Sequence, residues 1–222
     1  MREHGGSLES VTMQSKEVAL ARDVREYEAI FNKFNISKAS KIIDLGCGIG
    51  RWAKWFCDKI FRYDGIDFSR ECIKTAKQKF NDEAGFRFYC WDLCNISNFA
   101  EFEKAGYDLC IVNGTFMYLN DSKLERVLGF LPSIMASNSQ IYIRESVSIV
   151  GDRLTLKDFY SSELGNTYNA IYRTDSEYFR LFNMAFNPID FCLQESALLL
   201  DETLNSRKET SQKYYLFAKN IR

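Results

Sequence analysis

The residues that decide the fold are Ile42-Ile43-Asp44-Leu45-Gly46-Cys47-Gly48-Ile49-Gly50. The apolar residues before Gly46 predict a short buried strand, and the glycines at every second position predict a tight turn that opens into a helix. Glycine has no Cβ, so its backbone can approach a bound ligand closely at such a turn. The stretch therefore predicts the first strand of an α/β sheet with a ligand-binding turn at its end.

Strand-like and helix-like segments alternate around this turn. Strands are predicted at 41–45, 63–67, 86–90, 107–112 and 140–144, and helices at 52–60, 70–80 and 124–131. Such alternation with short connections predicts a parallel sheet covered by helices on both faces. A further helix is predicted at 175–185, and strands at 189–195 and 214–218. The expected fold class is α/β, a doubly wound, mostly parallel seven-stranded sheet whose last strand is antiparallel.

Two segments lie outside the alternation. Apolar residues recur at helical spacing over 12–35, which predicts an N-terminal helix within a helical cap formed by residues 1–38. Residues 147–174 are rich in Tyr, Ser, Asp and Arg without a clean period, which is long for a structureless connection. We expect an insertion over 147–186 that forms a lid on a single domain covering 1–222.

The composition excludes several classes of function. Lys and Arg number 29 against 30 for Asp and Glu, a net charge of −1, so nucleic acid is not an expected partner. No apolar run would span a membrane and residues 1–6 lack the apolar stretch of a signal peptide, so a cytoplasmic protein is expected. His4 is the single histidine and no cysteine pair has C-x-x-C spacing, so we expect no metal site and reduced, buried cysteines.

The glycine turn is compatible with two cofactor classes, a nicotinamide or flavin dinucleotide and S-adenosylmethionine. The dinucleotide fingerprint G-x-G-x-x-G/A, started at Gly46, requires a small residue at position 51, which holds Arg51. A nicotinamide oxidoreductase is therefore the disfavoured alternative. The pattern that is present, Asp44-x-Gly46-x-Gly48-x-Gly50, resembles the cofactor loop of class I S-adenosylmethionine-dependent methyltransferases.

Three more motifs follow in the order that this resemblance implies. Asp67 ends the second strand about twenty residues after Gly48, the spacing at which an acidic side chain reaches the ribose hydroxyls. Its alternative role is a helix cap. Trp91-Asp92-Leu93 ends the third strand, where the resemblance implies contacts to the adenine. It also implies that the end of the fourth strand, at Asn113, lies below the sulfonium. The expected cofactor-binding residues are Asp44, Gly46, Cys47, Gly48, Arg51, Asp67, Phe68, Trp91, Asp92, Leu93 and Asn113.

Methyl transfer from a sulfonium needs alignment and exclusion of water, and an oxygen or nitrogen acceptor can also need a base on the rim of the pocket. Glu145, at the end of the fifth strand, and His4 are the two candidates. Their alternative interpretations are an ion-paired surface carboxylate and a tail residue. The candidates for binding the acceptor are Arg144 and Arg173, through bidentate hydrogen bonds, and Tyr160, Tyr168 and Tyr172, through ring faces and hydroxyls. Arg173 could instead pair with Asp175 or Glu177.

The segments 154–161 and 168–174 resemble small-molecule methyltransferases found with bacterial surface-polysaccharide enzymes. We therefore expect an O-methyltransferase that acts on a small polar acceptor such as a sugar, a sugar nucleotide or a phosphate-bearing metabolite, as a monomer or homodimer. An N-methyltransferase of a small amine or amino sugar is one alternative. A protein that binds S-adenosylmethionine without catalysis is another.

Overall fold

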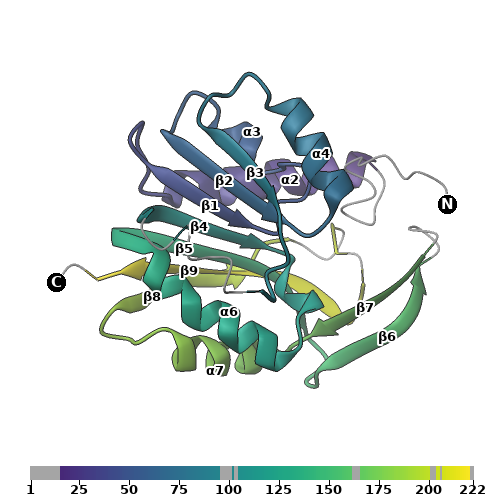
Figure 1. Cartoon of the computed structure of the whole chain (residues 1–222). Coiled ribbons are helices and arrows are strands. Elements are labelled where there is room, and N and C mark those ends of the chain that lie inside the picture. The colour runs from purple at the N-terminus through teal and green to yellow at the C-terminus, as the bar shows by residue number, and fades with distance from the viewer. Residues whose placement is uncertain are drawn as a thin grey trace.

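The computed structural model describes residues 16–95, 102, 105–161, 166–200, 204–205 and 207–220. Its main sheet has seven strands in the order β3-β2-β1-β4-β5-β9-β8 (Figure 1). The strands are β1 (Lys41–Leu45), β2 (Arg62–Asp67), β3 (Phe86–Cys90), β4 (Tyr107–Asn113), β5 (Met135–Ser148), β8 (Phe191–Leu198) and β9 (Thr210–Lys219). β1 to β5 are mutually parallel, and β9 runs antiparallel to both β5 and β8. The predicted fold class is confirmed.

Helices cover both faces of this sheet (Figure 1). They are α2 (Lys16–Ile30), α3 (Ala53–Phe56), α4 (Arg70–Lys79), α6 (Asp121–Ile134) and α7 (Asp175–Ala185), with 3-10 turns η1 (Phe31–Lys33) and η3 (Phe116–Tyr118). On one face, apolar side chains of α2, α3 and α4 such as Ile30, Phe56 and Ile73 form one core. On the other face, α6 and α7 contribute Leu128 and Phe182 to a second core. The parallel strands are therefore buried on both sides, which explains their continuous apolar sequence.

Local signals explain most helix boundaries. Ser69 accepts a hydrogen bond from the amide of Cys72 and begins α4, while Thr174 and Glu177 form a reciprocal capping box that begins α7. The helix predicted over 52–60 is shorter than expected, since α3 ends at Phe56. Asp58 adopts a positive φ of 59°, a left-handed conformation that a helix cannot continue through.

The insertion contains strands that the sequence pattern did not reveal. β6 (Leu154–Ser161) and β7 (Asn166–Tyr172) form an antiparallel hairpin outside the main sheet, and β7 contacts η3 and β5 (Figure 1). α7, although within the predicted insertion 147–186, packs into the main core through Tyr178 and Leu181. Among the described residues of the insertion, the β6–β7 hairpin is the part that stands apart from the sheet, beside the carboxyl ends of its central strands.

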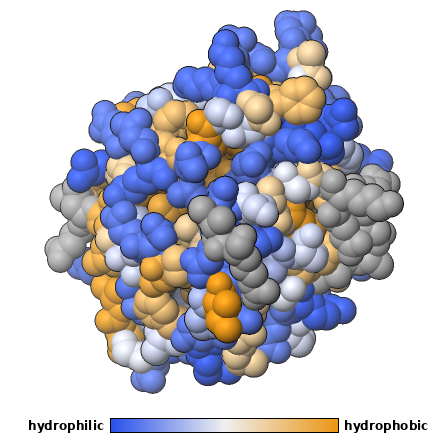
Figure 2. All heavy atoms as spheres, turned by 90° about the vertical axis from the view of Figure 1, so that its left-hand side faces the viewer, coloured by the Kyte–Doolittle hydropathy of each residue, from blue (hydrophilic) through white to orange (hydrophobic). Residues whose placement is uncertain are grey.

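The surface on the side of the molecule turned to the viewer in Figure 2 is mostly hydrophilic, with hydrophobic residues scattered among charged ones. None of the described helices combines the length and apolar character needed to cross a membrane. Within the same residues, no group of three His, Cys, Asp or Glu side chains comes together in a way that would hold a metal ion.

Candidate functional site

The glycine turn lies where the sheet order reverses. β1 pairs with β2 on one side and with β4 on the other. The chain therefore adds β2 and β3 on one side of β1 and then crosses over to add β4 and β5 on the other side. Ligands of open α/β sheets bind in the crevice outside the carboxyl ends of the strands at such a point. The candidate site is accordingly the region around the ends of β1, β2 and β4.

The three glycines of the turn adopt positive φ angles of 81°, 54° and 78° at Gly46, Gly48 and Gly50. The outer two allow close packing within the protein. A Cβ at Gly46 would lie 2.0 Å from Oγ1 of Thr115, and one at Gly50 would lie 2.5 Å from the ring of Phe80. The turn is thus a tight structural element in which a larger residue cannot replace glycine without displacing a neighbour.

Asp67 connects the end of β2 to this turn. Its Oδ2 accepts a hydrogen bond of 2.9 Å from the amide of Gly48, and its Oδ1 accepts one of 2.8 Å from the amide of Ser69. Burial raises the pKa of Asp67, and these two hydrogen bonds oppose that effect. The structure therefore places the carboxylate of Asp67 next to the glycine turn. Phe68, the next residue, is 75% exposed and free to cover a ligand.

Asp44 is buried directly before the turn. The hydroxyl of Tyr63 donates to its Oδ2, while its Oδ1 has no hydrogen-bond partner among the described residues. Burial raises the pKa of Asp44 to about 7, although the Tyr63 hydroxyl and the charge of Arg51 act in the opposite direction. A buried carboxylate oxygen without a donor favours a ligand that brings one. Cys47 is also buried, which raises the pKa of its thiol.

Glu26 of α2 joins the ends of several strands. Its carboxylate accepts hydrogen bonds from Arg51, Arg144, Tyr142 and the side-chain amide of Asn113. Burial alone would raise the pKa of Glu26, but the charges of Arg144 and Arg51 lower it to about 2. We did not identify Glu26 from the sequence, because a glutamate on an amphipathic helix is ordinarily exposed.

The network around Glu26 leaves several buried polar atoms without partners among the described residues. Nη2 of Arg51 and Nε of Arg144 are unpaired donors, and Oδ1 of Asn113 is an unpaired acceptor, as is Oδ1 of Asp44. Arg51 also pairs with Asp23 at 2.8 Å, and Lys54 pairs with the same carboxylate. The site therefore holds both unpaired donors and unpaired acceptors. An anionic group of a ligand would accept hydrogen bonds from the donors, and a cationic group would donate to the acceptors.

The three residues after β3 differ in burial, since Trp91 and Leu93 pack into the core and Asp92 is exposed. Trp91 packs its ring against Tyr89 and Phe102 at 5.3 and 5.5 Å, and Leu93 is buried in the same core. Asp92 is exposed, and the hydrogen bond that its Oδ1 accepts from the amide of Cys94 lowers its pKa. The amide of Trp91 donates to the carbonyl of Asp67, which brings the third strand end next to the second. Of the three predicted residues here, Asp92 has the side chain accessible to a ligand.

Glu145 does not lie on the rim, so its predicted position was wrong. It is fully buried, and its carboxylate accepts hydrogen bonds from the amides of Thr115, Phe116 and Met117 at 2.8, 2.8 and 3.2 Å. Burial raises the pKa of Glu145 to about 7 against the effect of these amides. Its oxygens hold the start of η3 in place, and the side chain is not accessible to take a proton from an acceptor. His4, the other candidate base, lies outside the described residues.

The two arginines expected to bind an anionic acceptor are occupied within the protein. Arg173 is fully buried and bonds to the carboxylate of Asp121 and to the carbonyls of Phe116 and Leu119. Its partner is therefore neither Asp175 nor Glu177. Arg144 donates to Glu26 and to Gln212. The prediction that Arg173 faces an acceptor was wrong, because its burial and pairing depend on segments distant in the sequence. Arg144 is paired through its terminal nitrogens, while its Nε has no partner among the described residues.

The predicted tyrosines differ in exposure. Tyr160 on β6 is 62% exposed, whereas Tyr172 on β7 is 5% exposed and packs with Met117 of η3. Tyr168 lies between them on the hairpin, and its hydroxyl accepts a hydrogen bond of 3.1 Å from Arg207. Tyr168 and Tyr172 thus come together with an arginine that the sequence analysis did not single out.

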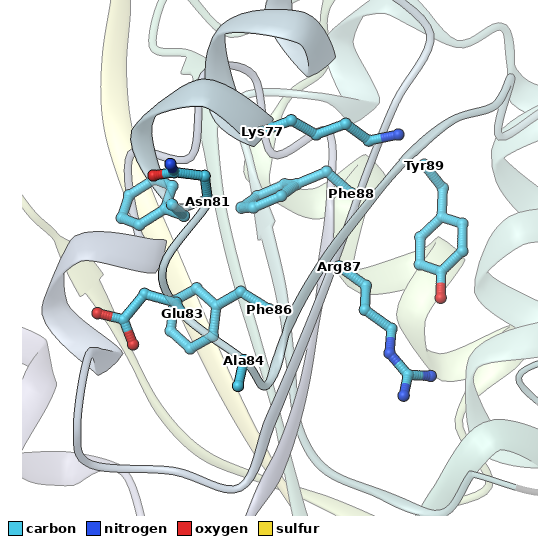
Figure 3. A pocket seen from close by; sticks show the side chains of 9 residues that line it. Lys77, Asn81, Glu83, Ala84, Phe86, Arg87, Phe88 and Tyr89 are labelled. Atoms are coloured by element: carbon cyan, nitrogen blue, oxygen red, sulfur yellow. The ribbon is translucent and has the colours of Figure 1, made fainter.

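A separate hollow of about 470 Å³ lies between α4 and β3 (Figure 3). Its lining includes the rings of Phe80, Phe86 and Phe88 and the charged side chains of Lys77 and Arg87. None of the residues predicted to bind the cofactor or the acceptor lines it. This hollow is therefore distinct from the crevice at the strand ends.

A family described as a methyltransferase domain matches residues 42–136, the segment from β1 to the first residues of β5. The chain is 28% identical to phosphoethanolamine N-methyltransferase 1 of Triticum aestivum over 142 residues, 63% of this chain and 28% of that protein. It is 37% identical to malonyl-[acyl-carrier protein] O-methyltransferase of Acetivibrio thermocellus over 82 residues, 36% of this chain and 27% of that protein. The matches span less than a third of these relatives.

Solved structures share the fold. Phosphoethanolamine N-methyltransferase 1 of Haemonchus contortus, in complex with phosphoethanolamine and S-adenosylhomocysteine, matches 98% of this chain and 46% of its own with a TM-score of 0.74 and 17% identity. An S-adenosylmethionine-dependent methyltransferase from Mesorhizobium loti matches 88% of this chain and 98% of its own, with a TM-score of 0.65 and 13% identity. The [4+2]-cyclase SpnF matches with a TM-score of 0.67 and 10% identity, over 96% and 85% of the two chains. At these identities the likeness shows the architecture.

Proposed function

We propose that this chain is a class I S-adenosylmethionine-dependent methyltransferase and that it moves the methyl group of S-adenosylmethionine to an oxygen of a small polar acceptor. The family match over residues 42–136 and the sheet order support this assignment of the domain and of its cofactor. The identities of the acceptor, a small polar molecule, and of the methylated atom, an oxygen, are the parts that we propose. A nitrogen acceptor is the second candidate, because the similarity to phosphoethanolamine N-methyltransferase extends over 63% of this chain.

The unpaired polar atoms at the crevice carry the assignment of cofactor contacts. S-adenosylmethionine has an ammonium group, a carboxylate and a ribose diol. The free oxygens of Asp44 and Asn113 suit the ammonium, and the free nitrogen of Arg51 suits the carboxylate. Asp67, half-buried beside Gly48, would accept hydrogen bonds from the diol in exchange for those it accepts now. Phe68 and Asp92 would contact the adenine.

The bound cofactor supplies an electrophilic methyl carbon on a sulfonium that leaves as a neutral thioether. The acceptor atom forms a bond to that carbon as the carbon–sulfur bond breaks, so the protein must hold donor and acceptor in line. Segment 115–118 contributes to this alignment. The hydroxyl of Thr115 donates to the carbonyl of Leu45, directly before the glycine turn, and Glu145 holds the amides of the same segment. Donor and acceptor sides are thereby fixed to each other.

The hydrogen bonds of Glu145 limit which chemical groups can serve as the acceptor. Because its carboxylate is engaged by three amides, it is not the base that removes a proton from a hydroxyl. An oxygen that is already ionised, as in a phosphate or carboxylate, and a neutral amine need no base before attack. We therefore favour an anionic oxygen or an uncharged amine over an alcohol. His4 remains the proposed base if the acceptor is a hydroxyl.

Calorimetric titration with S-adenosylmethionine and S-adenosylhomocysteine, followed by transfer of a radiolabelled methyl group, tests the proposal. We expect both nucleosides to bind and the label to move to one member of a panel of phosphorylated amines, dicarboxylates, sugar phosphates and sugar nucleotides. The sugars are included because of the resemblance of 154–161 and 168–174 to polysaccharide-linked methyltransferases. Failure to bind either nucleoside would reject the proposal, and binding without transfer to any acceptor would favour the non-catalytic alternative.

A further inference from the structure

Arg207, in the connection between β8 and β9, reaches across to the β6–β7 hairpin. Its Nη2 donates a hydrogen bond of 3.1 Å to the hydroxyl of Tyr168, and the guanidinium also interacts with the hydroxyl of Tyr172. The guanidinium carbon lies 4.7 Å from the centre of the Phe159 ring. Three hairpin side chains therefore orient a single cation.

This cation has no carboxylate partner among the described residues. By contrast, Arg51, Arg153 and Arg173 each pair with at least one carboxylate. A guanidinium has five N–H donors, and tyrosine hydroxyls and an aromatic face do not neutralise its charge. Arg207 is half-buried, so water screens its charge only in part.

The position of the cluster links it to the crevice. Tyr172 packs in one small core with Met117 of η3, and the amide of Met117 is held by Glu145. Thr115, two residues earlier, donates to the carbonyl of Leu45 at the start of the glycine turn. One short segment, 115–118, therefore contacts the cofactor turn at one end and the Tyr172 ring at the other.

We propose that Arg207, Tyr168 and Tyr172 form the binding site for an oxyanion, a phosphate or a carboxylate, carried by the acceptor. The inference rests on the proposed function for the identity of the ligand as an acceptor. A guanidinium matches the paired oxygens of both groups, and a tyrosine hydroxyl can donate to a further oxygen. The oxyanion holds one end of the acceptor on the hairpin, so its nucleophilic atom lies toward segment 115–118.

Calorimetric titration of the full chain with inorganic phosphate and, separately, with malonate tests the site. The variants are Arg207→Gln and the matched control Lys208→Gln, which removes a charge from the exposed neighbouring residue. We expect the wild type to bind at least one anion at millimolar concentration. Arg207→Gln should bind it about tenfold more weakly, and Lys208→Gln within about twofold of the wild type. The anion with the lower dissociation constant identifies the chemical class.

Equal affinity in the wild type and in Arg207→Gln would overturn the proposal, as would a wild type that binds neither anion. If Arg207→Gln does not keep the wild-type melting temperature, Tyr168→Phe replaces it, because this change removes the hydroxyl while keeping the ring next to Phe159. Tyr168→Phe should then weaken anion binding several-fold, and unchanged binding would contradict the proposal. Titration with S-adenosylhomocysteine tests the proposed function independently, since Arg207 is not assigned to the cofactor.

Discussion

Thr115 lies directly against Gly46, and the contact joins two strand ends that are far apart in the sequence. The hydroxyl of Thr115 donates a hydrogen bond of 3.1 Å to the carbonyl of Leu45, while a Cβ at Gly46 would lie 2.0 Å from the same hydroxyl oxygen. The carboxyl ends of β1 and β4 therefore fit together only with glycine at position 46. In the proposed function, this contact aligns the methyl donor with the side on which the acceptor binds.

The first prediction concerns Gly46→Ala. The alanine must adopt a φ near 81°, which costs about 1–2 kcal/mol, and its Cβ must displace Thr115 from Leu45. We expect a loss of about 2–4 kcal/mol in the free energy of unfolding and at least tenfold weaker binding of S-adenosylhomocysteine. Denaturant unfolding and calorimetry measure the two effects.

Gly129→Ala is the matched control. Gly129 lies inside α6, and a Cβ there would meet no atom within 4 Å. Alanine in a helix interior is more favourable than glycine by roughly 0.5–1 kcal/mol, so this variant should be as stable as the wild type or more stable. If Gly46→Ala behaved like Gly129→Ala, the close packing of the turn against Thr115 would not exist.

The second prediction concerns Glu26→Gln. The change removes the charge that Arg51 and Arg144 face in a buried environment, so Arg144 loses its carboxylate partner and Arg51 keeps only Asp23. Breaking a buried ion pair in this way costs about 3–5 kcal/mol. Thermal unfolding should therefore show a large decrease in stability, with Glu28→Gln, an exposed position on the same helix, close to the wild type.

The lowered pKa of Glu26 also predicts that the free energy of unfolding decreases at acidic pH. The folded-state pKa of Glu26 is lowered from 4.5 to about 2, so the folded chain binds fewer protons than the unfolded chain between these values. Its contribution is present above pH 4.5 and is lost as the pH falls toward 2. Glu26→Gln should thus be closer to the wild type in stability at pH 3 than at pH 7, and a constant difference would contradict the pairing of Glu26 with Arg51 and Arg144.

The third prediction concerns Arg173→Met. Loss of the guanidinium leaves the carbonyls of Phe116 and Leu119 without their donor and removes the partner of Asp121. We expect stability to fall by about 3–5 kcal/mol, together with cofactor affinity, because the same segment contacts the glycine turn. Arg180→Met, on the exposed side of α7, should affect neither. A higher KM for the acceptor alone, with unchanged stability, would show that Arg173 faces the acceptor after all.

The features that could be predicted from the sequence are those that depend on residues close together along the chain. The turn at Gly46 and the strand ending at Asp67 follow from the local pattern and from the pairing of consecutive strands. The mostly parallel sheet with helices on both faces followed from the alternation of strands and helices. These features need no knowledge of which side chains meet across the molecule.

Burial of charged side chains could not be predicted in this way. Glu26 is buried because α2 packs over the ends of β4 and β5, and Glu145 is buried because segment 115–117 folds back onto it. The hairpin strands β6 and β7 were missed because most of β6 is exposed or half-buried, so its sequence lacks an apolar alternation. Arg207 gave no signal, since its partner Tyr168 is 39 residues away in the sequence and Phe159 is farther still.

The last prediction concerns the pH dependence of cofactor binding through Asp44. Its folded-state pKa is raised from 3.8 to about 7, so the free chain holds a proton there below pH 7, and this group contributes stability that is lost as the pH rises toward 7. If Asp44 binds the ammonium of S-adenosylmethionine as proposed, only its carboxylate form attracts the cofactor. Affinity should then rise about tenfold from pH 6 to pH 8 and level off above it, because one proton is released on binding.

Asp44→Asn separates this effect from other titrations. The amide cannot ionise, so the variant should bind S-adenosylmethionine more weakly at pH 8 and show almost no change between pH 6 and pH 8. It should also gain roughly 2–4 kcal/mol of stability relative to the wild type on going from pH 5 to pH 8, since the wild type alone must bury a charge there. Asp67→Asn is the comparison, because it removes the other raised carboxyl at the turn while keeping Asp44. If Asp67→Asn abolished the pH dependence and Asp44→Asn preserved it, the ammonium contact would be assigned to the wrong aspartate.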